Sequence, residues 1–516
     1  MFHTHKVSLP RDFGNPKVAV SNTIWAMGIF DFFHKIPDVS EISYPLPYAG
    51  EEHWRKLSFD VKEFADSKVC SPKLAMMSFG FALSCFTAMD LSKSGEANAV
   101  RYLELANFTN ICASEDYAHH ASPTSLGYVF GTRKVKRGKE KFTLVAIGIR
   151  GGHYGAEWAS NAKLGDDGLH RGFEEASERL LRDFATYLAL KKVKGPVYVW
   201  ICGYSRAGGI AASMAERLTQ AINDPSVSIL HPFGKAELDQ DHLYVHTFAA
   251  PRAGYKGCPL RRYVHHFINP EDLVPKIPFI GYGFGRNGIC HELAITEEVE
   301  EKVMGRLDME GLIVEKHAFH AMAIDLLHIL DKDRRFVVDK DYTGGQKRFL
   351  DDLCETMESR LPREAYAKYI QDGLVALGSL VDEQEVHPYE KLASFLRAIF
   401  DGVASYYGIL ALLTKLASEK TQWKSLLRPF VEKAIEDTPE LEGQDEAILT
   451  TIAGLLHFLR PSAKEMISYY PTIRDVENAK SVVYAHEPVR YLILLLGQEV
   501  DLAADDGADA VAAPQQ

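Results

Sequence analysis

The chain has 516 residues, of which 46% are apolar and 25% charged, as in a globular protein with a large buried core. This composition excludes an intrinsically disordered chain, a collagen and a small disulfide scaffold. Its 58 lysines and arginines against 70 aspartates and glutamates give a net charge of −12. A surface of that sign repels phosphate backbones, so no nucleic acid is expected among the partners.

The seven cysteines are scattered, and no two have the spacing of a zinc site or of a disulfide framework. Reduced thiols in a cytoplasmic protein are the simpler interpretation. The N-terminal segment lacks the basic and then apolar pattern of a signal peptide, which favours the same location. The longest uncharged apolar run, residues 74–89, is shorter than the roughly twenty residues of a membrane span. It predicts a buried core helix, and no integral membrane span.

Residues 1–140 have a mixed pattern. Polar loops are expected from Pro37 to Trp54, a helical stretch from about 72 to 108, and strand-like pieces at 125–135. We expect this region to form a mixed extension that packs on the core.

From residue 141 the pattern changes to apolar runs that alternate with helix-period segments. The runs predict buried strands at 142–149, 197–203, 242–250 and 263–269. The helix-period segments lie at 170–192 and 208–222. This alternation predicts an α/β fold with a mostly parallel, doubly wound sheet over residues 141–335.

The remaining residues have a different character. Residues 336–500 contain long charged and apolar helix-period segments, which predict a helical region folded against the core. Residues 501–516 are small, acidic and polar, and predict a disordered tail.

The segment GYSRAGG, residues 203–209, lies between a predicted strand and a predicted helix. This is the context of the sharp turn that presents a nucleophilic serine at the edge of an α/β sheet. Such a turn strains the backbone at Ser205 and needs small neighbours, which the glycines and Ala207 supply. The competing interpretations are a packing turn and a phosphate-binding loop, although neither phosphate-loop spacing is present.

A serine hydroxyl is a poor nucleophile unless a histidine base and an orienting carboxylate assist it. In this fold the chain order is serine, acid, histidine. The segment FINPEDLVPKIP, residues 267–278, places Asp272 just after a predicted strand and between two prolines. Glu271 is the rival acid, and a capping aspartate in a turn is the alternative without a catalytic role.

Five segments together resemble the class 3 (fungal-type) lipases of the α/β-hydrolase superfamily, most strongly the bacterial lipase-like branch. They occur in the family's order over residues 142–278. They are IGIRGGHYGAEWASN (147–161), HRGF (170–173), GYSRAGG (203–209), FAAPRAG (248–254) and NPEDLVPKIP (269–278).

The resemblance implies an α/β-hydrolase fold with Ser205 as the nucleophile and Asp272 as the triad acid. It also implies an oxyanion hole built from the backbone N–H groups of Arg206 and of Gly151 or Gly152. Gly152 stands where many members have Thr or Ser, whose hydroxyl helps to hold the hole. The hole is then expected to rest on backbone groups alone, and the activity to be modest.

The loop from Gly152 to Leu169 occupies the lid position of that family. Gly152, Tyr154 and Trp158 in this loop, together with Tyr204, are the candidate residues of the substrate cleft. Because the loop also carries several charges, soluble esters are candidate substrates beside lipids.

Three histidines compete for the role of base. His320 precedes a helix at about the separation from Asp272 that such lipases show, and its His-Ala-Met surroundings resemble bacterial members. His317 lies one helical turn away. His486 stands in front of a terminal apolar helix and returns to the site if the helical region is an insertion. We expect His320 to be the base, with His486 as the alternative.

The expected function is hydrolysis of a carboxylic ester through an acyl-enzyme on Ser205, with a role in lipid metabolism. The expected partner is an ester or lipid substrate, met by transient contact with a lipid surface, and no metal or cofactor is required. One alternative is a catalytically silent binding or scaffold protein on the same fold. Another is thioesterase, phospholipase, acyltransferase or amidase chemistry with the same residues.

Overall fold

The computed structural model divides the chain into two units, Met1–Asp38 and Val39–Gln516, and the elements below belong to the second. Only part of the chain is described. The described residues are 37–48, 51–85, 95–117, 126–151, 160–161, 163–165, 167–223, 233–307, 345–369, 421–458, 485–509 and a few positions between 395 and 406.

A seven-stranded sheet is the central element, in the strand order β11-β9-β7-β6-β5-β4-β3. The strands from β5 to β11 run parallel, whereas β3 and β4 pair antiparallel at one side. The predicted α/β fold with a mostly parallel sheet is therefore confirmed. The strands are β3 (Thr109–Ala113), β4 (Tyr128–Arg137), β5 (Glu140–Ile149), β6 (Lys194–Tyr204), β7 (Lys235–Phe248), β9 (Val264–Ile268) and β11 (Ile289–Glu292).

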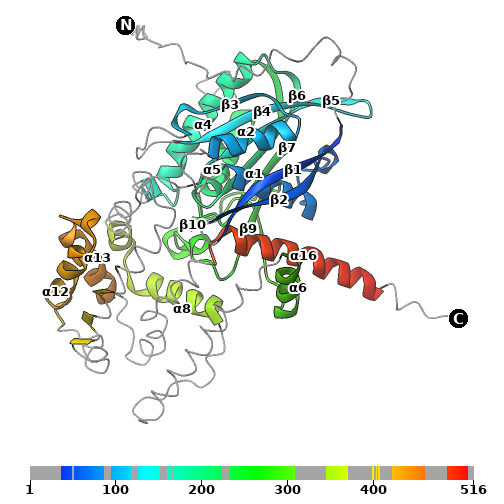
Figure 1. Ribbon diagram of the computed structural model, residues 1–516. Helices are drawn as coiled ribbons and strands as arrows, with labels where there is room; N and C mark the ends of the chain where they lie inside the picture. Colours follow the sequence, from blue (N-terminus) through cyan, green and yellow to red (C-terminus); the bar gives the residue numbers. More distant parts are fainter. Residues whose placement is uncertain are drawn as a thin grey trace, which may run out of the picture. The chain divides into compact units, whose positions relative to one another are not determined.

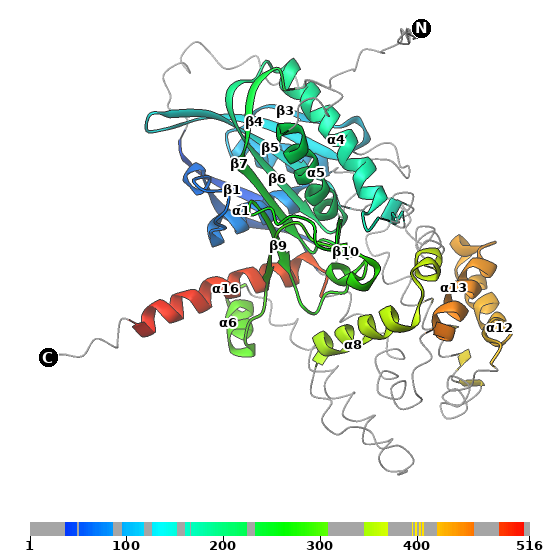
Figure 2. The ribbon, with the colours of Figure 1, turned by 180° about the vertical axis from the view of Figure 1, so that it is seen from behind.

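Side chains alternate between two apolar clusters along these strands, one cluster on each face of the sheet. One face is covered by α4 (Arg171–Leu190) and α5 (Arg206–Asn223), which Figure 2 shows in front of the sheet. The other face is covered by segments from both ends of the chain, seen in Figure 1. They are β1 (Val39–Tyr48), β2 (Glu51–Asp60), α1 (Pro72–Ser84), α2 (Gly95–Leu105), α6 (Glu297–Leu307) and α16 (Pro488–Asp509).

This arrangement differs from a doubly wound sheet in one respect. The strands β5, β6, β7 and β9 follow one another across the sheet without a reversal of order. Right-handed crossovers that all step in the same direction place their helices on the same face. The second face is therefore left to segments that lie outside the alternating region.

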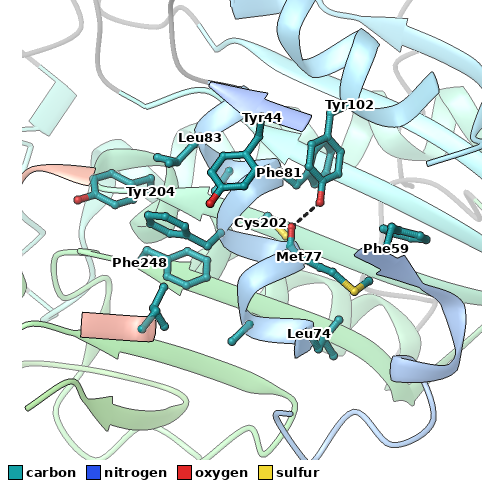
Figure 3. Packing of buried hydrophobic residues seen from close by; sticks show 14 of the residues in the cluster. Tyr44, Phe59, Leu74, Met77, Phe81, Leu83, Tyr102, Cys202, Tyr204 and Phe248 are labelled. Atoms are coloured by element: carbon teal, nitrogen blue, oxygen red, sulfur yellow. Dashed lines mark hydrogen bonds between the residues drawn. The ribbon is translucent and has the colours of Figure 1, made fainter. Parts of the chain in front are cut away.

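The cluster on that second face is rich in aromatic side chains, and Figure 3 shows part of it. The Trp200 ring lies 4.9 Å from that of Phe81 and 5.3 Å from that of Phe64, centroid to centroid. The Tyr102 hydroxyl donates to the Met77 carbonyl at 2.7 Å, which satisfies a buried polar group (Figure 3). Burying one such ring stabilises the fold by roughly 2–3 kcal/mol before conformational entropy is subtracted.

Helix α1 forms most of the long apolar run, and it is buried on nearly all sides. The predicted core helix is thus confirmed over residues 74–84. Among the described residues, no helix is both long enough and apolar enough to cross a membrane.

Two sequence-based expectations were wrong. The polar loops predicted from Pro37 to Trp54 are largely the antiparallel hairpin of β1 and β2. Pro45 and Pro47 argue against a strand in the middle of a sheet, but a two-stranded ribbon leaves alternate N–H groups unpaired and tolerates them. Helix α16 continues to Asp509, so residues 501–509 of the predicted disordered tail are helical.

The helical region predicted from residue 336 contains α8 (Gly345–Arg360), α12 (Trp423–Glu436) and α13 (Asp445–Phe458). Helix α8 is anchored to the turn that follows β9. The Lys276 ammonium pairs with Asp351 at 2.5 Å, and the Gly281 N–H donates to Glu358 at 3.0 Å. Two short strands, β8 (Gly254–Tyr255) and β10 (Phe284–Gly285), pair beside this turn.

Candidate active site

Ser205 lies alone between the end of β6 and the first residue of α5. Its φ of +56° is a left-handed conformation that residues other than glycine rarely adopt. The Ser205 N–H donates to the Phe248 carbonyl of β7 at 2.8 Å, and the Ser205 carbonyl accepts from the Gly208 N–H at 2.9 Å. The strained turn is therefore held by the neighbouring strand and by the helix it opens.

The small residues around the serine are there because backbone elements approach one another closely. A Cβ atom at Gly203 would lie 2.4 Å from the Ala207 carbonyl oxygen. A Cβ at Gly208 would lie 2.6 Å from that of Ala250. No side chain fits at either contact without a backbone shift, so the turn has the geometry that the glycine spacing predicts.

Three side chains far apart in the sequence form a continuous hydrogen-bonded row. The Ser205 Oγ lies 2.9 Å from His486 Nε2, and His486 Nδ1 lies 2.7 Å from Asp272 Oδ2. A carboxylate only accepts, so Nδ1 carries the proton and Nε2 accepts the Ser205 O–H. This is the geometry of a serine–histidine–acid triad.

Asp272 is fully buried and held by several donors. Its Oδ1 accepts from the Val274 N–H at 2.9 Å, and its Oδ2 accepts from the Tyr491 hydroxyl at 2.9 Å as well as from His486. The rival acid Glu271 points elsewhere and pairs with Arg490 at 3.5 Å. The structure thus brings Asp272, and not Glu271, to the histidine.

The turn that carries His486 is fixed by residues of the core. The Asn269 side-chain amide donates to the Ala485 carbonyl at 2.8 Å, and the Tyr204 hydroxyl donates to the His486 carbonyl at 2.6 Å. Helix α16 starts at Pro488, and its Arg490 forms an ion pair with Glu300 of α6. The histidine is therefore positioned by the docking of α16.

The predicted base, His320, lies outside the described residues, as does His317. The position beside Ser205 and Asp272 is occupied by the alternative, His486. The geometry of the described residues therefore favours His486 for the role of base. In the sequence, His486 is marked only by the apolar helix that begins at Pro488, two residues later. This pattern is no more specific to a catalytic histidine than the residues around His320.

The two predicted oxyanion-hole residues lie at the same edge of the sheet. Ile149 of β5 is the register partner of Gly203 in β6, so Gly151 follows β5 just as Ser205 follows β6. Arg206 is the first residue of α5, whose N-terminus directs its positive end toward the serine. Both residues are buried, which strengthens any hydrogen bond made there.

The cleft candidates have different outcomes. Gly152, Tyr154 and Trp158 lie outside the described residues. Tyr204 is only 1% exposed, and its ring packs against that of Tyr491 at a centroid distance of 5.5 Å. Its hydroxyl donates to the His486 carbonyl, so Tyr204 holds the turn of His486 from within the core.

Other histidines lie on strands of the sheet, and their hydrogen-bond partners within the described part of the chain do not include Ser205. The Ser78 hydroxyl is 2.8 Å from His246 Nδ1, and His265 Nδ1 is 3.0 Å from His291 Nε2. Burial lowers the pKa of His246 and His266 well below the usual value, and that of His291 to about 4. Among the described residues, no group of three or more His, Cys, Asp or Glu side chains is arranged to hold a metal ion.

No protein-family model, no curated protein and no solved structure matches the chain. The lipase resemblance therefore rests on the five short segments, and the chemistry of the site is argued from its geometry.

Proposed function

We propose that the protein is a serine hydrolase that cleaves carboxylic esters through an acyl-enzyme on Ser205. The observation that carries the proposal is the unbroken row of hydrogen bonds from Ser205 through His486 to the buried carboxylate of Asp272. The strained turn at Ser205 adds to it, because strain of this kind is costly and is characteristic of functional sites.

In the proposed reaction, His486 Nε2 takes the proton of Ser205 as its oxygen attacks the ester carbonyl. Asp272 keeps the ring oriented and stabilises the imidazolium that forms. The backbone N–H groups of Arg206 and Gly151 face the developing oxyanion. The protonated histidine then gives its proton to the leaving alcohol, and water repeats the sequence to release the acid.

The proposed substrate class is a carboxylic ester. The net charge of −12 disfavours tight binding to anionic lipid surfaces. Nothing in the proposed chemistry separates soluble esters from lipids, since acyl selectivity depends on the residues that line the cleft.

The test is turnover of p-nitrophenyl esters from acetate to palmitate by the wild type and by Ser205→Ala. We expect the variant to lose on the order of 10³-fold or more in kcat. A matched control is Ser213→Ala, because Ser213 is a buried serine of α5 whose Oγ has no hydrogen-bond partner within the described residues. Equal turnover by the wild type and Ser205→Ala on every ester would sink the proposal and favour a silent scaffold.

A further inference from the structure

Tyr491 lies in the first turns of α16, shortly after His486, and is fully buried. Its hydroxyl is 2.9 Å from Asp272 Oδ2. This is the same oxygen that accepts the Nδ1–H of His486 at 2.7 Å. One segment of the chain therefore supplies both the base of the proposed triad and a second donor to the acid.

The direction of the Tyr491 hydroxyl is fixed by its other partner. The Asn269 N–H donates to the Tyr491 oxygen at 3.1 Å, and an ionised carboxylate has no proton to give. The hydroxyl hydrogen must therefore point at Asp272. Burial, together with the nearby carboxylate, raises the pKa of Tyr491 well above its usual value, so the hydroxyl stays a donor across the working pH range.

We propose that Tyr491 is a positioning residue of the reaction, which fixes the plane of the Asp272 carboxylate and limits how strongly that carboxylate attracts the proton of His486. This inference rests on the proposed function. It assigns Tyr491 no contact with the substrate, so its effect passes entirely through Asp272.

The physical reason is that a carboxylate oxygen shared by two donors offers less negative charge to each of them. Without the hydroxyl, His486 is the only donor to Oδ2 that remains among the described residues, and the imidazolium form gains stability. The neutral histidine is the form that accepts the serine proton. Loss of the hydroxyl therefore moves the acid limb of the kcat/KM profile to higher pH. The Val274 N–H still holds Oδ1, so kcat falls without vanishing.

Tyr204 provides a matched control. It is also a buried tyrosine, and its ring packs edge-on against that of Tyr491. Its hydroxyl donates to the His486 carbonyl and not to the carboxylate. Tyr204→Phe therefore disturbs the turn that carries the base without changing the charge on Asp272, and leaves the acid limb in place.

The experiment is the pH profile of p-nitrophenyl acetate hydrolysis from pH 5 to 9 for the wild type, Tyr491→Phe and Tyr204→Phe. For Tyr491→Phe we expect the acid limb to move up by about half a pH unit to one unit, and kcat to fall about tenfold with little change in KM. An unmoved limb in Tyr491→Phe, or equal shifts in both variants, would overturn the role of Tyr491 alone. A wild type that hydrolyses no ester would instead remove the proposed function and this inference together.

A second replacement covers the outcome in which Tyr491→Phe does not fold. Incorporation of 3-fluorotyrosine at position 491 preserves the packing and makes the hydroxyl a stronger donor. The acid limb is then expected to move to lower pH, opposite to the effect of phenylalanine. A limb that stays in place or moves up would contradict the proposal.

Discussion

The proposed nucleophile and the proposed base are held by very different parts of the chain. Ser205 is fixed by residues of its own turn and by the adjacent strand β7. His486 is fixed by hydrogen bonds from its ring to Asp272 and from Tyr204 to its carbonyl, which span 214 and 282 positions. The first arrangement is local and rigid, whereas the second depends on the docking of one helix.

Because of this difference, a substitution near Ser205 and a substitution in α16 are expected to disrupt the site in different ways. A disturbance of the turn at Ser205 acts on the core itself, because α5 and β6 belong to the central layers. A disturbance of α16 leaves the serine in place and removes its base. The variants below separate these two modes of failure, in order of decreasing expected effect.

The largest effect is expected from His486→Ala. Loss of the base lowers kcat by on the order of 10³-fold or more while the protein stays folded. His320→Ala is the control, and it is expected to keep most of the wild-type turnover. Steady-state kinetics on one ester decides the matter, since a larger loss in His320→Ala would return the role of base to that histidine.

The next largest effect is expected in the turn at Ser205. Gly203→Ala places a methyl group 2.4 Å from the Ala207 carbonyl, so the backbone has to shift. We expect the free energy of unfolding to fall by about 2–3 kcal/mol, measured by chemical denaturation. Gly305→Ala in α6 is the matched control, because its added methyl meets nothing within 4 Å. That change should be neutral or stabilising by up to about 1 kcal/mol.

Asn269→Ala tests how the turn that carries His486 is held. The variant loses the hydrogen bond to the Ala485 carbonyl, which helps to hold the turn of His486. We expect kcat to fall about tenfold, with a loss of roughly 1–2 kcal/mol in stability. Normal kcat in a variant that is destabilised by this amount would show that the turn is held without Asn269.

The last effect grows as the pH falls, and it comes from the histidines buried in β7 and β9. The pKa of His246 and of His266 is lowered in the folded state, so these groups bind fewer protons folded than unfolded. Their contribution is fully present above the unfolded value of about 6.5 and is lost as the pH falls below it, by at most about 1.4 kcal/mol per pH unit for each group. Denaturant unfolding at pH 8, 6 and 5 measures the slope, and His246→Gln should reduce it. A slope unchanged by that substitution would exclude His246 as its source.

Much of the central region was predictable because its signals are local. The apolar runs predicted the parallel strands, and the glycine spacing placed Ser205 on a strained turn. Strand β7 begins well before its apolar run, since its first half is exposed on alternate residues and lacks the continuous pattern. Asp272 was predictable for a similar reason, because the end of a strand and two nearby prolines mark its turn.

The base was not predictable in the same way. Which histidine reaches Ser205 depends on where the chain returns to the sheet, and neither periodicity nor spacing encodes that return. The same limit applies to the hairpin of β1 and β2, whose strands are stabilised by packing on α1 and α2. Long-range packing decided both cases.

The position of α16 has a further consequence for protein synthesis. Its apolar residues, including Val489 and Leu492, complete the same cluster as α1 and the hairpin. The start of α16 follows the end of α6 by 488 − 307 = 181 positions. At typical translation rates the ribosome needs roughly 10 to 40 seconds to cover that distance. Throughout that interval the nascent chain lacks the residues of α16 that cover this apolar surface, and it carries the proposed nucleophile without its proposed base.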